Sequence, residues 1–101
     1  MSNSLTQGEK LRLIRESERL NRRELAAMVG LVYGTYAGYE GDKMKMSFEA
    51  GIRLFKHPRF NKYQDWFMYG RVNPATGQIA PALAHCGQDG TILQQSENKA
   101  G

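Results

Sequence analysis

One part of the chain combines basic side chains with a run of small and weakly polar ones. The run is VYGTYAG at residues 32–38, and the basic residues on either side of it are Arg22, Arg23, Lys43 and Lys45. Guanidinium and ammonium groups neutralise backbone phosphates, whereas hydroxyl and methyl groups can contact base edges in a major groove. These residue types in this order favour recognition of double-stranded DNA, although each cation alone could be a solvated surface charge.

The elements that must position these residues are two short helices joined by a tight turn. Asn21 can cap a helix over residues 22–29, and Glu24 stands at its third position, where it completes a capping box. Gly30 stands where that helix must end, because glycine enters a sharp left-handed turn without strain. A second helix is predicted over residues 33–40. This spacing is typical of a helix-turn-helix, and the alternative is an ordinary αα-hairpin in a small bundle.

The second of these helices is expected to bury Tyr36 and Tyr39 and to leave its other face open to DNA. That face carries Val32, Tyr33, Gly34, Thr35, Ala37 and Gly38. Valine and threonine methyl groups could contact thymine, and the hydroxyl of Thr35 or Tyr33 could hydrogen-bond a base or a phosphate. The helix has no Asn, Gln or Arg, so we expect sparse direct readout, with DNA shape contributing to specificity.

Three further helices complete the predicted bundle. Their N-caps are Thr6, Ser47 and Asn61, and they cover residues 7–19, 48–56 and 62–69. Glu9 gives the first of them capping-box spacing, while Pro58 and Gly70 end the other two. The predicted core consists of Leu11, Ile14, Leu25, Val29, Leu31, Tyr36, Tyr39, Ile52, Phe55 and Trp66.

The chain of 101 residues has the size of one ordinary domain. We predict an all-α, compact five-helix domain over residues 1–70, a short extended dimerisation segment over 71–86 and a flexible tail over 87–101. Pro81 argues against a central strand or a long helix in the middle segment. There is no apolar run near the roughly 20 residues of a membrane span, and the N-terminus lacks a signal peptide. Cys86 cannot form an internal disulfide, which favours the cytoplasm.

Charge is distributed unevenly along the chain. Residues 1–62 hold 12 Lys and Arg against 7 Asp and Glu, whereas residues 63–101 hold 2 against 3. The two parts therefore carry net charges of +5 and −1. Positive charge is concentrated around the predicted helix-turn-helix, as phosphate neutralisation requires.

A run of four large apolar residues at 66–69 predicts a subunit interface, because one helix cannot face all of them into a single core. Aromatic residues and methionine are enriched at such interfaces. The predicted dimer contact comprises Trp66, Phe67, Met68, Tyr69, Ile79, Ala80, Pro81, Ala82 and Leu83. The alternative is a C-terminal segment that folds back over its own helices.

The sequence does not favour an enzyme. It contains no CxxC, HExxH or glycine-rich phosphate loop, so we expect neither a metal nor another cofactor. His85 and Cys86 are adjacent and do not form a nucleophile–base pair by themselves. A self-cleaving protease domain would not fit in the roughly 20–30 residues beyond the predicted core.

The helix-turn-helix pattern resembles the XRE-like fold of compact phage repressors. The resemblance extends further: VYGTY, FNKYQDWFM and TGQIAPALAHCGQ are similar to the C immunity repressors of peduoviruses, the P-two-like temperate phages. It covers nearly the whole chain, and the C-terminal phrase is its most specific part. The resemblance implies an ion pair between Arg15 and Glu40 that ties the first helix to the recognition helix.

The same resemblance implies a repressor in the cytoplasm of the bacterial host. It would bind operator repeats at the early lytic promoter as a homodimer to maintain lysogeny. The family's half-sites are direct repeats, whereas a two-fold dimer would more simply predict a palindrome. A phage antirepressor is a further possible partner, and no membrane partner is expected.

Two glycines in the second helix leave the sequence-based interpretation open. Gly38 stands where a larger side chain is common in the family, and Gly34 is a second glycine in a helix of only two turns. Each would cost roughly 0.5–1 kcal/mol in a helix interior. They either let the backbone approach the groove floor or are tolerated neutral variants.

The alternative function is an antitoxin of the same small fold, which binds a toxin and autoregulates its operon.

Overall fold

A computed structural model of the chain describes residues 5–86. Within this range the backbone forms helices and no strand, as predicted for an all-α fold. The elements are α1 (Gln7–Ser17), α2 (Arg22–Val29), α3 (Tyr33–Glu40), α4 (Phe48–Lys56), η1 (Asn61–Tyr63), α5 (Gln64–Tyr69), η2 (Pro74–Thr76) and α6 (Ala82–Cys86). No helix in the described part is both long and apolar enough to span a membrane. The tail predicted at 87–101 lies outside the described residues.

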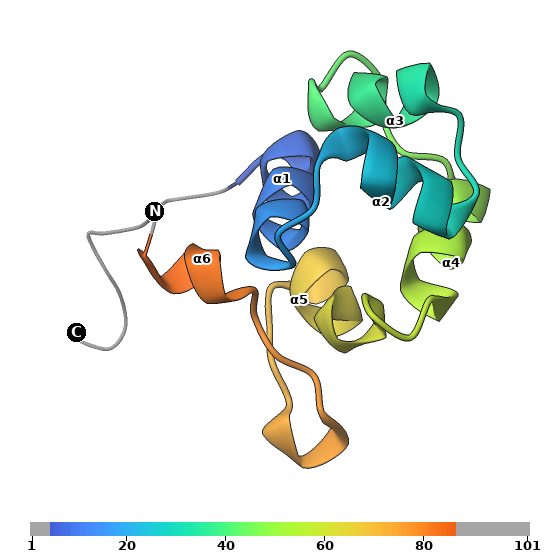
Figure 1. The fold of residues 1–101 in the computed structure, drawn as a ribbon. Helices are drawn as coiled ribbons and strands as arrows, with labels where there is room; N and C mark the ends of the chain where they lie inside the picture. Colours follow the sequence, from blue (N-terminus) through green and yellow to red (C-terminus); the bar gives the residue numbers. More distant parts are fainter. Residues whose placement is uncertain (1–4, 87–101) are drawn as a thin grey trace.

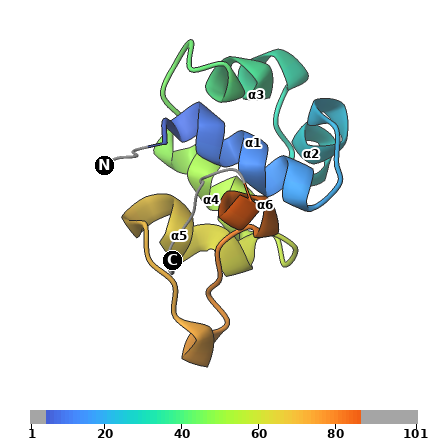
Figure 2. The same cartoon turned by 90° about the vertical axis from the view of Figure 1, so that its left-hand side faces the viewer.

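Helix α1 lies between the helix-turn-helix and the C-terminal segment. It contacts α3 and α6, and α2 contacts α3 in turn. Both views place α3 at one end of the molecule and the segment around η2 at the opposite end, where it projects from the helices (Figures 1 and 2). The tip of the C-terminal segment therefore lies at the opposite end of the molecule from α3, whereas α6 packs on α1.

The predicted caps are confirmed at three helices. Thr6 and Asn21 each form a complete capping box with the glutamate three residues later. Ser47 accepts a hydrogen bond from the backbone N–H of Ala50 at 3.1 Å. Gly30 ends α2 in the left-handed region, with φ 76°. Local sequence signals therefore set where α1, α2 and α4 begin and where α2 ends.

Most of the residues that were predicted to be buried lie in the core or pack against it. Its buried members are Leu11, Ile14, Leu25, Ala26, Val29, Tyr36, Tyr39, Ala50, Leu54, Phe55, Phe60, Tyr63 and Phe67, with Leu31 and Trp66 partly buried against them. Ile52 is the predicted core residue that is wrong, since it is 47% exposed. Helix α4 instead packs on Ala50, Gly51, Leu54 and Phe55. The small side chains at 50 and 51 permit close packing, which turns Phe48 and Ile52 outward.

The region after α4 also differs from the single helix predicted there. Asn61 does not act as a helix cap: its amide donates to the backbone oxygen of Phe55 at 2.9 Å. A 3₁₀ turn, η1, precedes α5, which begins at Gln64. This turn brings Tyr63 into the core.

The C-terminal segment folds back over its own chain. The backbone N–H of Ile79 donates to the carbonyl of Lys62 at 2.9 Å, and the backbone N–H of Leu83 donates to the hydroxyl of Ser17 at 3.1 Å. Pro81 is buried. Residues 82–86 form the short helix α6 where an extended segment was predicted. The described part of this segment thus packs on α1 and η1, as the fold-back alternative requires.

Glu18 joins the end of α1 to η1. Its side chain, 11% exposed, contacts Arg59 at 2.8 Å, Lys62 at 3.0 Å and the hydroxyl of Tyr63. Burial alone would raise the pKa of Glu18, but the hydrogen bonds from Tyr63 and the two cations outweigh it and lower the pKa from 4.5 to about 2. The folded state therefore holds this carboxylate in its charged form down to strongly acidic pH.

Acid is expected to weaken the fold through this contact. Because the pKa is depressed in the folded state, the stabilisation is complete above pH 4.5 and is lost as the pH falls toward 2. With allowance for solvent screening of the exposed partners, Glu18→Gln should cost about 2–3 kcal/mol at pH 7 and progressively less below pH 4.5. Urea unfolding of both proteins across this range measures the difference. A gap that does not change with pH would contradict the assignment.

Candidate nucleic-acid interface

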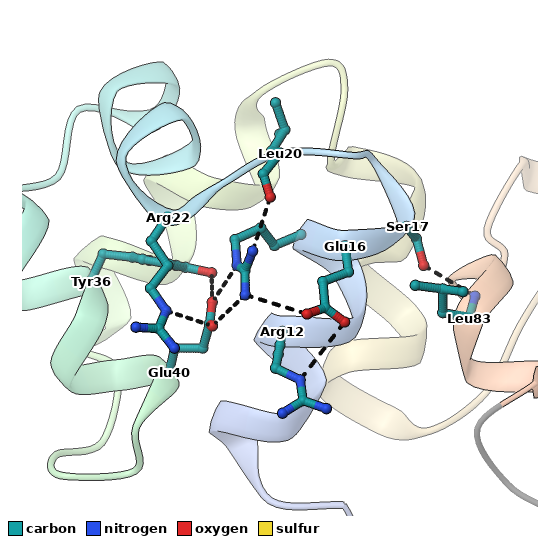
Figure 3. Close-up of polar contacts among 9 residues, drawn as sticks. Arg12, Glu16, Ser17, Leu20, Arg22, Tyr36, Glu40 and Leu83 are labelled. Carbon is teal, nitrogen blue, oxygen red and sulfur yellow. Dashed lines mark hydrogen bonds and ion pairs between the residues drawn. The ribbon is translucent and has the colours of Figure 1, made fainter.

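The inner face of α3 is anchored by the carboxylate of Glu40 (Figure 3). Arg15 donates to both of its oxygens, from Nε at 2.9 Å and from Nη2 at 2.8 Å. Arg22 Nε donates at 3.1 Å, and the hydroxyl of Tyr36 donates at 2.6 Å. These contacts link α1, α2 and α3 at one point, and the pairing of Arg15 with Glu40 is the one that the family resemblance implied.

The electrostatics of this cluster keep Glu40 charged and Tyr36 neutral. Burial alone would raise the pKa of Glu40, but the hydrogen bonds from Arg15, Tyr36 and Arg22 outweigh it and lower that pKa. Burial and the adjacent carboxylate both raise the pKa of Tyr36. The carboxylate therefore faces two guanidinium groups and one neutral phenol, and Arg15 also pairs with Glu16 at 3.7 Å.

The opposite face of α3 is open to solvent at its N-terminal half. Val32 is 74% exposed and Tyr33 is 37% exposed. Gly34 has open space around it, with no atom within 4 Å of the position of an added Cβ. Thr35 and Ala37 are half-buried. This half of the helix presents backbone, small side chains and the ring of Tyr33, but no Asn, Gln, Lys or Arg.

Gly38 was predicted to lie on the outer face of α3, and this prediction is wrong. It is buried, and a Cβ there would lie 2.6 Å from the terminal methyl of Met44. The loop that follows α3 brings Met44 over this position. The open surface of α3 therefore ends before Gly38, and that residue is removed from the predicted set of contacts.

The predicted cations surround this surface in different ways. The guanidinium of Arg23 lies 4.2 Å from the centre of the Tyr33 ring, at the start of α3. Arg22 is half-exposed but is paired with Glu40. Lys43 and Lys45 are exposed in the loop after α3. Cations thus stand near both ends of the helix.

Comparison with known proteins identifies the family. No family model matches the chain. The chain is 42% identical to "Repressor protein C" of Escherichia phage P2, over 101 residues that cover both proteins completely. It belongs to the P2-like C immunity repressors. It is therefore a phage repressor, which is a regulatory class of protein.

Three contacts in the repressor's helix-turn-helix were not predicted from the sequence. Tyr36 stands four residues before Glu40, a spacing that could have suggested their hydrogen bond. The stacking of Arg23 on Tyr33 joins two helices, and no local pattern indicates it. Arg22 was predicted to contact phosphate alone, whereas its pairing with Glu40 gives it a structural role as well.

The predicted dimer residues of the repressor lie in several environments. Phe67 and Pro81 are buried within the chain itself, so they are removed from the predicted contact, and Trp66 and Ala80 are half-buried. Met68, Tyr69, Ile79, Ala82 and Leu83 are exposed. Met68 and Tyr69 line a groove with Phe48 that no residue of 79–83 lines. The exposed members thus divide into a groove beside α4 and the surface of the C-terminal segment.

Proposed function

We propose that this repressor binds operator DNA through α3 in the cytoplasm of a bacterial host. In this proposal it occupies operator repeats at the early lytic promoter, as a homodimer, and so maintains lysogeny. The observation that carries the proposal is the contrast between the two faces of α3. One face is tied to α1 and α2 through Glu40, and the other presents exposed Val32, Tyr33 and Gly34.

The exposed residues favour insertion of the N-terminal half of α3 into the major groove. Recognition helices of this class contact base edges mainly through their first residues. Val32 and Thr35 would bring methyl groups to thymine, and open space at Gly34 would let the backbone come close. Since these groups make few directional hydrogen bonds, DNA shape is expected to contribute to operator choice.

The cations would hold the strands on either side of the groove. Arg23 and the amino end of α2 would face one phosphate, where the partial positive charge of the helix adds to the attraction. Lys43 and Lys45 would contact the backbone beyond the other end of α3. Arg22 supports both the cluster at Glu40 and the positive potential beside it.

Nuclease footprinting on the early promoter region of the phage itself tests the proposal. We expect protection of repeated short sites, with affinity that falls steeply as salt rises, because cations on the protein displace counterions. Absence of protection, or equal affinity for unrelated duplexes, would refute specific operator binding.

Thr35→Ala separates specific binding from non-specific binding. Loss of the hydroxyl and methyl group is expected to weaken operator binding by about 1–3 kcal/mol and to leave binding to unrelated DNA nearly unchanged. Titrations of labelled duplexes at one salt concentration measure both affinities. Equal losses on the two duplexes would assign Thr35 to the fold or to a phosphate contact rather than to base recognition.

A second copy of the chain is the proposed protein partner, and a phage antirepressor remains a prediction. Ile79 and Leu83 are exposed apolar residues on the C-terminal segment. Ile79→Asp or Leu83→Asp is expected to convert the dimer to a monomer, because a carboxylate would be desolvated at the interface. Analytical ultracentrifugation measures the mass. Ala75→Asp, on exposed η2, serves as a control, and unchanged mass for both test variants would contradict this interface.

A further inference from the structure

Asp42 lies in the turn that follows α3, in a conformation that usually selects glycine. Its φ is 59°, in the left-handed region. The N–H of Asp42 bonds to the carbonyl of Tyr39 at 3.2 Å, and the N–H of Lys43 bonds to the carbonyl of Gly38 at 2.9 Å. These are the two bonds of a Schellman turn, whose left-handed position glycine occupies most often because it has no Cβ. The backbone alone therefore gives no reason for an aspartate here.

The side chain of Asp42 supplies that reason, because it caps a different helix. One carboxylate oxygen accepts from the hydroxyl of Thr6 at 2.6 Å, and the other accepts from the backbone N–H of Gly8 at 2.9 Å. The same threonine accepts from the N–H of Glu9. The hydrogen bonds from Thr6 and Gly8 lower the pKa of Asp42, and a carboxylate at the N-terminus of a helix is electrostatically favourable.

Gly8 permits the close approach on which this contact depends. A Cβ at Gly8 would lie 2.3 Å from the backbone oxygen of Glu40 and 2.9 Å from the carboxylate of Asp42. The side-chain oxygen of Gln7 also accepts from the backbone N–H of Met46 at 2.7 Å. The first turn of α1 thus holds the loop after α3 at Asp42 and again at Met46, on both sides of Lys43 and Lys45.

We propose that Asp42 is a positioning residue for DNA binding, which fixes α3 and the lysine loop as one rigid unit against the start of α1. This inference rests on the proposed function. The start of α1 holds the end of α3 at Gly8, and Arg15 holds it again through Glu40. Gly8 and Arg15 are about two helical turns, roughly 10 Å, apart along α1. Together with the core packing of Tyr36 and Tyr39, the attachment at Asp42 restrains the orientation of the C-terminal end of α3.

Orientation matters for this repressor because α3 offers few directional contacts to bases. When a helix tilts, atoms at its surface move away from the bases. Apolar contacts and shape complementarity weaken quickly as such gaps open. The attraction of Lys43 and Lys45 to phosphates is Coulombic and falls off slowly with distance, so a small shift of their loop changes it less. Loss of Asp42 should therefore reduce discrimination between operator and unrelated DNA more than it reduces general attraction to DNA.

Asp42→Gly tests the inference, because glycine keeps the left-handed turn and removes only the carboxylate. We expect operator affinity to fall about 10- to 100-fold, with less than roughly threefold change on unrelated duplex, at a temperature where circular dichroism shows full folding. Asp42→Asn, which keeps an oxygen acceptor for Gly8, should lie between the two. Operator affinity of Asp42→Gly equal to wild type would overturn the proposal.

Gly8→Ala with Gly51→Ala as the matched control tests the close approach. Both are buried glycines in helices, but a Cβ at Gly51 meets only Met46 at 3.6 Å, an ordinary contact. Gly8→Ala is expected to lose operator affinity at least as strongly as Asp42→Gly, and Gly51→Ala to keep it. Equal affinities for these two variants would count against the inference.

Amide hydrogen exchange gives a second readout that needs no DNA. The N–H of Gly8 should exchange slowly in wild type and rapidly in Asp42→Gly. Fast exchange in the wild type would overturn the inference. A wild-type protein without operator preference would refute the proposed function and this inference with it, whereas wild-type operator binding by Asp42→Gly would refute this inference alone.

Discussion

Glu40→Ala is expected to lower the free energy of unfolding by about 3–5 kcal/mol, because it removes the carboxylate that both Nε and Nη2 of the largely buried Arg15 contact. Arg15 would keep only the carbonyl of Leu20 and the more distant carboxylate of Glu16. The Arg15 side chain is 11% exposed and Glu40 is 2% exposed. The substitution also removes the acceptor for the buried hydroxyl of Tyr36. The half-exposed Arg22 should add little to this cost, since solvent screens its charge.

Urea unfolding of wild type and variant measures this effect. Small domains are stable by only about 5–15 kcal/mol, so the loss should be large in proportion. Glu49→Ala is the control: Glu49 forms an exposed pair with Arg53 on α4, and its removal should cost less than about 1 kcal/mol. Similar losses for the two variants would show that the cluster at Glu40 does not behave as a buried ion pair.

Gly34→Glu is expected to weaken operator binding by roughly a hundredfold, or about 2.7 kcal/mol, without loss of the fold. Gly34 lies on the exposed side of α3, where an added Cβ meets no atom within 4 Å. A carboxylate at this position would bring negative charge and bulk against the groove while disturbing nothing inside the protein. Binding titrations and thermal unfolding of the same preparation separate the two effects.

Gly34→Ala is the control for this prediction. It should raise the free energy of unfolding by about 0.5–1 kcal/mol, since alanine costs less backbone entropy than glycine in a helix. Any loss of operator affinity in this variant would come from steric contact alone. Wild-type operator affinity in Gly34→Glu would show that this face of α3 does not enter the groove.

Helix boundaries were predictable where a few neighbouring residues set them. The capping boxes at Thr6 and Asn21 and the turn at Gly30 each depend on contacts within about five residues. The orientation of α4 was not predictable in this way. Its sequence allows one apolar face through Phe48, Ile52 and Phe55 and another through Leu54 and Phe55, and the structure uses the second.

The candidate site shows the same division. The position of α3 and the basic residues near it follow from the pattern of the sequence, and the Arg15–Glu40 pair followed only from a family resemblance. The burial of Gly38 under Met44 was not visible, because it depends on the course of the loop after α3. The role of Arg22 at Glu40 joins residues 18 positions apart.

The sequence alone identified this repressor as a short basic helix-turn-helix protein of a recognisable phage family. It could do so because caps, turns and charge are local properties of the chain. Only the tertiary structure decided which face of α4 is buried, which dimer candidates stay on the surface and how α3 is held. Those outcomes depend on contacts between distant segments, such as the hydrogen bond between Thr6 and Asp42 across 36 positions. Local pattern does not specify such contacts, because they arise only when all the helices pack together.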